Sequence, residues 1–187
     1  MSGILHVCRA NRARSPLAEL ATRELLALRG AAPLVPVSSA GTWTPGGEPL
    51  WPPAAAEARA RGWDADSFRS RRLTRDLVGD ADLVLAATRD LRDEVIALAP
   101  FALRRTFTWR ELAWLCQGLS VEAAGRLEPG ERLAALPARM IARRGHLPVP
   151  AGPDLDVLDP VDQDPSYLPR AVDLITAALR PLVEQLT

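Results

Sequence analysis

Residues 3–28 read GILHVCRANRARSPLAELATRELLAL, and this stretch decides the fold. The hydrophobic run at residues 3–7 predicts a buried strand. Apolar residues recur at helical spacing over residues 17–28, which predicts a helix that Gly30 ends. A short loop therefore joins a strand directly to a helix. In parallel α/β sheets, such loops lie at the carboxyl ends of the strands, where ligands bind.

The same alternation continues along the chain. Hydrophobic runs predict further strands at residues 34–38 and 81–86, and a fourth strand is expected at residues 105–108. Helices are expected at residues 54–61, after the third strand as far as residue 98, and at residues 169–186. Strands that alternate with helices favour right-handed crossovers between parallel strands. We therefore predict an α/β fold of three layers, with a four-stranded parallel sheet and helices on both faces.

The chain has the size of one domain, so residues 1–187 are expected to form a single domain. Residues 110–150 are expected to be a helical insertion, because helical patterns recur there. Its basic residues Arg139, Arg143 and Arg144 have two interpretations. They belong either to the solvated face of an extra helical layer or to a surface that binds a substrate or partner.

Composition narrows the class of protein. Hydrophobic residues make up 48% of the chain, and 23 basic residues, all of them arginine, balance 23 acidic ones. A neutral globular chain has no general attraction to nucleic acid, so no nucleic-acid partner is expected. No apolar stretch approaches the roughly 20 residues of a membrane span, and no basic leader precedes the first strand. Since there are only two cysteines, a reducing, cytoplasmic setting is expected.

The loop at residues 8–16, CRANRARSP, has the residue types of an anion site. A loop that opens a helix presents free backbone N–H groups and the positive end of the helix dipole. These donors would stabilise a Cys8 thiolate, and the Arg14 guanidinium can hold two oxygens of a tetrahedral oxyanion. Ser15 can hydrogen-bond the thiolate or cap the helix. A thiolate that faces a phosphate seat predicts a phosphatase; the alternative is that Cys8 is a small apolar core residue.

The motif C-x-x-N-x-x-R-S-P at residues 8–16 resembles the phosphate-binding loop of the low-molecular-weight protein tyrosine phosphatase family. Two further segments agree in type and order, namely SAGT at residues 39–42 and Asp159-Pro160 near the C-terminus. Apart from the insertion, which precedes the loop of Asp159, the resemblance covers nearly the whole chain.

The resemblance implies hydrolysis of phosphomonoesters, above all protein phosphotyrosine, through a phosphocysteine intermediate. Cys8 would be the nucleophile, Arg14 would hold the phosphate and Asp159 would be the general acid. Further phosphate-binding residues are expected at Arg9, Ala10, Asn11, Arg12, Ala13 and Ser15, with Ser39 as a support. Because arginine and amides neutralise the phosphate charge, neither a metal nor a cofactor is expected. The substrate would be a phosphorylated protein or a small phosphomonoester, and the oligomeric state is left open.

Asp159 has a rival, because Asp164-Pro165 is a second Asp-Pro pair. The hydrophobic lead at residues 155–158 resembles the family's approach to its acid and favours Asp159. Asp164 lies just ahead of the last predicted helix, which is typical of a cap.

Two positions inside the molecule depart from the family pattern. Ala13 stands where many members have a second cysteine, so Cys8 cannot be protected by a disulfide there, and irreversible oxidation is expected. Phe68 stands where a histidine is frequent, so one support of the loop is expected to be missing.

Departures at the rim concern the substrate. Arg9 and Arg12 make the loop unusually basic, which would either stabilise the Cys8 thiolate or favour a more anionic substrate. Val161 follows Asp159-Pro160 where many tyrosine-specific members have aromatic residues, so a preference for tyrosine does not follow from the loop alone. Trp43 and Trp51 are candidates to line the entrance or to pack in the core.

Two alternative functions fit the same residues. An arsenate reductase of the same fold needs a thiol relay, but residues 86–89 contain no cysteine pair and Cys116 lies in an apolar stretch, where a buried structural role is expected. A non-catalytic phosphate-binding regulatory module would fit Phe68 and Val161. The intact set of Cys8, Arg14, Ser15 and Asp159 favours the enzyme.

Overall fold

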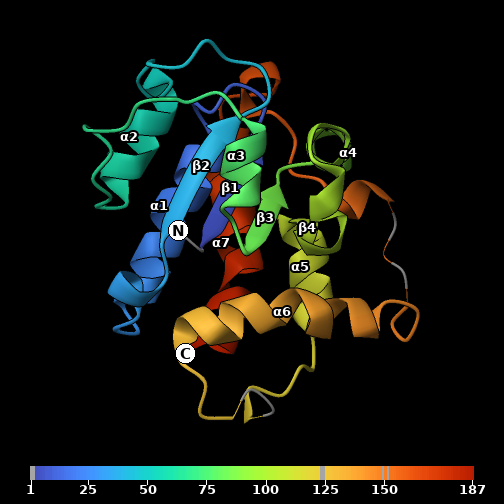
Figure 1. Ribbon diagram of the computed structural model, residues 1–187. Helices are drawn as coiled ribbons and strands as arrows, with labels where there is room; N and C mark the ends of the chain where they lie inside the picture. Colours follow the sequence, from blue (N-terminus) through green and yellow to red (C-terminus); the bar gives the residue numbers. More distant parts are fainter. Residues whose placement is uncertain (1–2, 123–124, 149, 151) are drawn as a thin grey trace.

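The computed structural model of the protein describes residues 3–122, 125–148, 150 and 152–187. Parallel strands form one sheet in the order β2-β1-β3-β4 (Figure 1). The strands are β1 (Ile4–Cys8), β2 (Val37–Gly41), β3 (Leu83–Ala86) and β4 (Thr106–Thr108). Ile4 of β1 pairs with both Val37 and Leu83, so the carboxyl ends of these strands lie at one edge. The predicted four-stranded parallel sheet is confirmed.

Helices connect the strands and flank the sheet. They are α1 (Arg14–Ala27), α2 (Pro52–Ala60), α3 (Arg75–Gly79), α4 (Arg89–Leu98), α5 (Trp109–Cys116), α6 (Pro129–Arg143) and α7 (Tyr167–Leu186). α1 and α7 begin three and two residues earlier than predicted, and α3 was not expected from the sequence. The helix after the third strand ends at Leu98 as predicted.

The three-layer arrangement is confirmed by the two faces of β1. Ile4 and Cys8 belong to a core that includes residues of α1, α5, α6 and α7. Leu5 and Val7 belong to a second core with Val78 of α3 and Val95 of α4. Successive side chains of a strand point to opposite faces, so β1 is covered on both sides. Figure 1 shows α7 behind the sheet.

The second strand differs from the prediction. Residues 34–38 were expected to form it, but Ala32–Leu34 form a 3₁₀ turn and β2 begins at Val37. Pro36 has no N–H for a ladder, and its carbonyl accepts from Ile4 N at 2.9 Å before the paired segment starts. Ser39 therefore lies inside β2, opposite His6, and not after the strand.

Residues 110–150 contain most of α5 and all of α6. α5 leaves β4 directly, because Thr108 caps it and Glu111 completes a capping box. α6 buries Leu133, Leu136 and Met140 in the same core as α7. Two arginines of α6 bind backbone carbonyls in the segment between α5 and α6: Arg139 donates to Ser120 O at 2.6 Å and Arg143 to Gln117 O at 2.5 Å.

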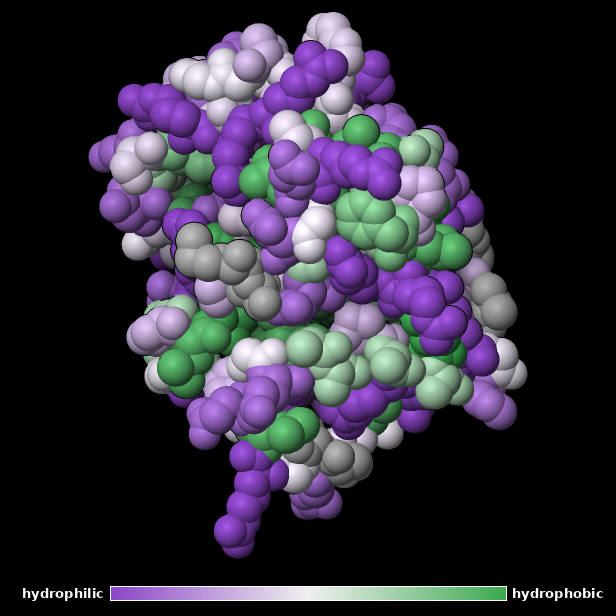
Figure 2. All heavy atoms as spheres, in the orientation of Figure 1, coloured by the Kyte–Doolittle hydropathy of each residue, from purple (hydrophilic) through white to green (hydrophobic). Residues whose placement is uncertain are grey.

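The outer surface is mixed in character. Figure 2 shows hydrophilic residues spread across one face and apolar residues in small groups. Exposed large apolar side chains lie far apart in the chain, such as Leu28 just after α1 and Leu103 just before β4. Within the described ranges, no helix is both long enough and apolar enough to span a bilayer.

Candidate active site

Cys8 ends β1, and its side chain is 3% exposed. Its sulfur accepts hydrogen bonds from Asn11 N at 3.3 Å and from Ser15 Oγ at 3.0 Å. Ser15 therefore bonds the sulfur, which is one of the two roles expected for it. It does not cap α1, since Ala13 holds the cap position without a side-chain hydrogen bond.

Asn11 organises the turn of the loop. Its backbone has a φ of +53°, in the left-handed region that Asn tolerates better than most residues. Its Nδ2 donates to Ser15 Oγ at 2.9 Å and to Ser39 Oγ at 2.8 Å. Its Oδ1 accepts from Arg71 N at 2.8 Å. All three side-chain contacts are internal, because Asn11 is fully buried.

The carbonyl groups of the loop are bonded to a neighbouring segment. Thr42 N donates to Cys8 O at 3.0 Å and Trp43 N to Arg9 O at 2.8 Å. Further along, Trp51 N donates to Arg12 O at 2.8 Å.

The amides of the loop behave differently from its carbonyls. Six of them have no acceptor among the described residues, namely those of Arg9, Ala10, Arg12, Ala13, Arg14 and Ser15. Gly41 lets the two segments approach, since a Cβ there would lie 2.6 Å from Arg9 O. The loop is thus a cradle of N–H donors that ends at the amino terminus of α1, which suits a phosphate group.

Arg14 closes the cradle and reaches across the molecule. Its Nη1 donates to Val157 O at 3.1 Å, and its Nη2 forms an ion pair with the Asp159 carboxylate. The Arg14 side chain is 5% exposed and that of Asp159 is 30% exposed. Asp159 Oδ1 also accepts from Val161 N at 3.3 Å, at the start of a 3₁₀ turn. The loop and the predicted acid therefore meet, although 145 residues separate them in sequence.

The rival acid has another role. Asp164 Oδ1 accepts from Ser166 N at 2.9 Å in the turn before α7, where Ser166 holds the cap position. Hydrogen bonds from the side chain and backbone of Ser166 lower the pKa of Asp164. Asp164 thus stabilises the turn into α7, while Asp159 contacts Arg14.

Sequence reasoning missed two residues that support the loop. Ser39 Oγ donates to Glu19 Oε2 at 2.6 Å, and Glu19 Oε1 pairs with Arg23 at 2.5 Å. Arg71 Nε donates to Ser39 O at 2.8 Å. A carboxylate on the buried face of α1 was the only available signal for Glu19. Phe68 is half-buried and packs against an apolar cluster, and the polar contacts with Ser39 come instead from Glu19 and Arg71.

The rim carries aromatic and basic side chains. Trp43 is 71% exposed, and the Arg9 guanidinium carbon lies 6.0 Å from the centre of its ring. Arg12 pairs with Glu48 at 3.2 Å and donates to Pro49 O at 3.1 Å. Trp51 packs instead against the cluster between α1 and α2. Of the two candidate tryptophans, only Trp43 is largely exposed to solvent.

Cys116 is separate from this chemistry. It ends α5 with 4% exposure, and its sulfur lies 3.8 Å from Met140 Sδ. Burial raises the pKa of its thiol to about 12. Among the described residues, no group of three His, Cys, Asp or Glu side chains could hold a metal ion.

Comparison with known families identifies the chain. Residues 3–112 match the family model described as low molecular weight phosphotyrosine protein phosphatase. The chain belongs to this phosphatase family. The match includes the Cys8 loop, Ser39 and Arg71, and it stops before Asp159. Members are cysteine-dependent phosphatases, so the chain is an enzyme of the low-molecular-weight protein tyrosine phosphatase class.

Its relatives agree with this assignment. A probable low molecular weight protein-tyrosine-phosphatase, EpsP of Ralstonia solanacearum, is 35% identical over 109 residues, or 58% of this chain and 71% of the relative. A low-molecular-weight tyrosine phosphatase from T. tengcongensis has the same fold, with a TM-score of 0.72, 22% identity and coverage of 100% and 99% of the two chains. YwlE arginine phosphatase from Geobacillus stearothermophilus also shares the fold, with a TM-score of 0.69, 23% identity and coverage of 98% and 91%.

Proposed function

We propose that this phosphatase hydrolyses phosphotyrosine in proteins through a phosphocysteine on Cys8. The observation that carries the proposal is the environment of the Cys8 sulfur. Cys8 ends β1 and opens a loop in which the Asn11 amide bonds the sulfur and six further amides have no acceptor among the described residues. Six donors and the Arg14 guanidinium match the charge and shape of a phosphate group. Both cysteines are free thiols, which fits a reducing, cytoplasmic setting.

In the first step, Cys8 Sγ attacks phosphorus, so the S–P bond forms while the bond to the tyrosine oxygen breaks. Asp159 gives its proton to that leaving oxygen. A phosphate bound at Arg14 Nη2 would take the place of the Asp159 carboxylate, which is paired there. The acid would then stand beside the leaving oxygen.

In the second step, water attacks the phosphocysteine and loses a proton to the Asp159 carboxylate. The S–P bond breaks, and the products are inorganic phosphate and the Cys8 thiolate. The loop amides and Arg14 hold the equatorial oxygens in both steps.

The rim supports a phenyl ester in an acidic context. Trp43 offers an exposed aromatic face, and Arg9 adds a positive charge beside it. Phosphoarginine, which the related YwlE is named for, would bring a guanidine group toward Arg9. Charge therefore favours phosphotyrosine flanked by acidic side chains over phosphoarginine.

Peptides test this proposal. The value of kcat/KM should be highest for a phosphotyrosine peptide with acidic flanks, lower for the same peptide with neutral flanks, and lowest for a phosphoarginine peptide. Cys8→Ser should abolish turnover, and Asp159→Asn should lower it roughly 100-fold or more, whereas Asp164→Asn should leave it unchanged. Mass spectrometry should find a phosphoryl group on Cys8 in quenched reactions.

Four results would contradict parts of this proposal. Full turnover by Cys8→Ser would sink the mechanism. Preference for the phosphoarginine peptide would overturn the substrate assignment, and thiol-dependent turnover of arsenate alone would favour a reductase. Binding of phosphopeptides without turnover would favour a regulatory module.

A further inference from the structure

The segment that carries Asp159 is held to the sheet by its own backbone. We call residues 156–159 the acid loop. Val157 is fully buried; its N–H donates to Ala87 O at 2.8 Å, and its carbonyl accepts from Arg14 Nη1 at 3.1 Å. These bonds fix the position of Val157 next to the carboxyl end of β3. The orientation of the rest of the acid loop depends on contacts made by the residues on either side of Val157.

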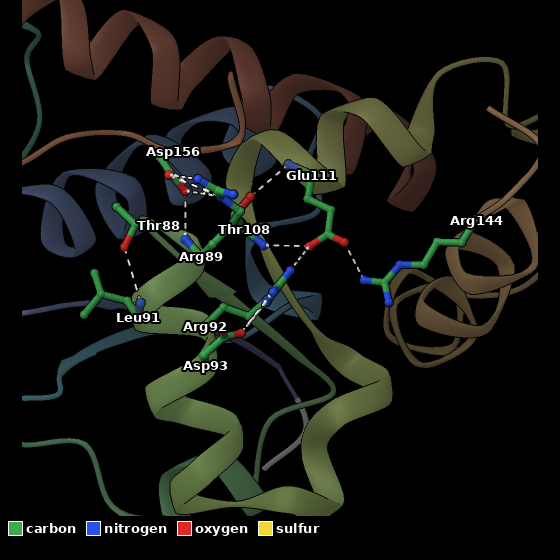
Figure 3. Close-up of polar contacts among 9 residues, drawn as sticks. All are labelled: Thr88, Arg89, Leu91, Arg92, Asp93, Thr108, Glu111, Arg144 and Asp156. Carbon is green, nitrogen blue, oxygen red and sulfur yellow. Dashed lines mark hydrogen bonds and ion pairs between the residues drawn. The ribbon is translucent and has the colours of Figure 1, made fainter. Parts of the chain in front are cut away.

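Asp156 supplies a second attachment, at the start of α4 (Figure 3). Its Oδ1 accepts from Arg89 N at 2.8 Å, and its Oδ2 accepts from Arg89 Nη2 at 3.0 Å and from Nε at 3.3 Å. The carboxylate is 16% exposed and the guanidinium side chain 40% exposed. One carboxylate thus binds both the first helical amide and the side chain of the same residue, which gives it a defined orientation.

We propose that the Arg89–Asp156 pair positions the general acid, and the inference rests on the catalytic role proposed for Asp159. Only two residues lie between Asp156 and Asp159, and the first of them is pinned on both sides. These two bonds leave Val157 free to turn about the line that joins them, so a rotation of the chain at Asp156 changes the direction in which Leu158 and Asp159 leave Val157, and moves Asp159 relative to Arg14. Arg89 and Asp156 are positioning residues that act through Asp159.

The chain contains a matched control one turn along α4. Arg92 pairs with Glu111 at 3.3 Å and with Asp93 at 2.9 Å, and Glu111 also pairs with Arg144 from the end of α6 (Figure 3). These contacts join α4 to α5 and α6. Among the described residues, Arg92 has no hydrogen bond or ion pair with the acid loop. Removal of Arg92 perturbs the same helix without releasing Asp156.

The test uses aryl phosphates with leaving groups of graded pKa. A misplaced acid hurts poor leaving groups most, so the slope of log kcat/KM against leaving-group pKa should become steeper in Arg89→Leu and Asp156→Asn. For phenyl phosphate, kcat/KM should fall about 10- to 100-fold, the range expected for a shift of ~1 Å in a catalytic group. Competitive inhibition by inorganic phosphate should stay within about twofold of the parent value, because the cradle is intact.

Three comparisons decide the result. Asp159→Asn should steepen the slope fully, Asp156→Asn in that background should add nothing, and Arg92→Leu should keep the parent slope. A parent slope in Asp159→Asn would overturn the acid assignment, and with it this inference. A steep slope in Asp159→Asn but parent slopes in Arg89→Leu and Asp156→Asn would overturn the positioning role alone. An equal change in Arg92→Leu would also overturn it, because the effect would then belong to α4 as a whole. If Asp156→Asn does not fold, Arg89→Leu decides the matter, since it keeps the backbone bond to Asp156.

Discussion

Mild acid should destabilise this phosphatase through one buried histidine. His6 lies in the middle of β1 and is fully buried. Its Nδ1 accepts from Trp109 Nε1 at 3.0 Å, so the proton of the neutral ring is on Nε2 and is donated to Thr22 Oγ1 at 3.0 Å. Thr22 in turn donates to Ala18 O at 2.7 Å. Protonation of Nδ1 would place its N–H opposite the N–H of Trp109, so that this hydrogen bond would be lost.

The magnitude follows from the shift in pKa. Burial, with a smaller contribution from Arg23, lowers the pKa of His6 from 6.5 to about 3. Below pH 6.5 the unfolded chain therefore binds a proton that the folded protein does not, and stability falls as the pH falls toward 3. Each pH unit in this window costs about 1.4 kcal/mol, so the loss is about 2 kcal/mol at pH 5 and approaches about 5 kcal/mol at the lower end.

Urea unfolding at several pH values between 7 and 5 measures this loss. His6→Gln retains one acceptor for Trp109 and one donor for Thr22 but does not titrate, so its free energy of unfolding should vary less with pH by about 2 kcal/mol over this interval. His146→Gln changes the other histidine and should keep the parent slope. Equal slopes in the parent protein and His6→Gln would refute the reasoning.

Further predictions concern the loop. Gly41→Ala should lower kcat/KM at least tenfold and stability by about 1–3 kcal/mol, because its Cβ would lie 2.6 Å from Arg9 O; unchanged kinetics would contradict the tight approach of the two segments. Asn11→Ala should cost about 2–4 kcal/mol in chemical denaturation, since three buried hydrogen bonds are lost at a positive φ. Asn11→Gly adopts the positive φ without strain but lacks the side-chain hydrogen bonds, so it should recover only the smaller part of the lost free energy of unfolding. Peroxide should inactivate the enzyme in a way that thiols do not reverse, and Cys116→Ala should show the same course; protection that depends on Cys116 would contradict its burial.

Much of the fold could be predicted because its signals are local. β1 and β3 are short apolar runs beside helical patterns, and both of them, like β4, overlap the segments where the sequence places them. The predicted second strand begins three residues before β2. The prediction followed hydrophobic residues alone, and Pro36 among them lacks the N–H that pairing in a sheet needs. α3 was missed because five residues carry too little periodicity; Thr74 caps it, and Val78 is fully buried.

The sequence by itself determined the reactive loop. Cys8, Asn11, Arg14 and Ser15 are neighbours in the chain, and a strand that turns directly into a helix brings them together whatever surrounds them. The resemblance favoured Asp159 over Asp164 as the acid, but tertiary structure alone decided which carboxylates contact the loop and its support Ser39. Glu19 reaches Ser39 across the layer between α1 and β2, and Arg14 reaches Asp159 over 145 residues of sequence. Such pairs depend on strand order, helix packing and the path of the last loop. Residues that meet in this way have no characteristic spacing in the sequence, so the sequence does not predict the contact.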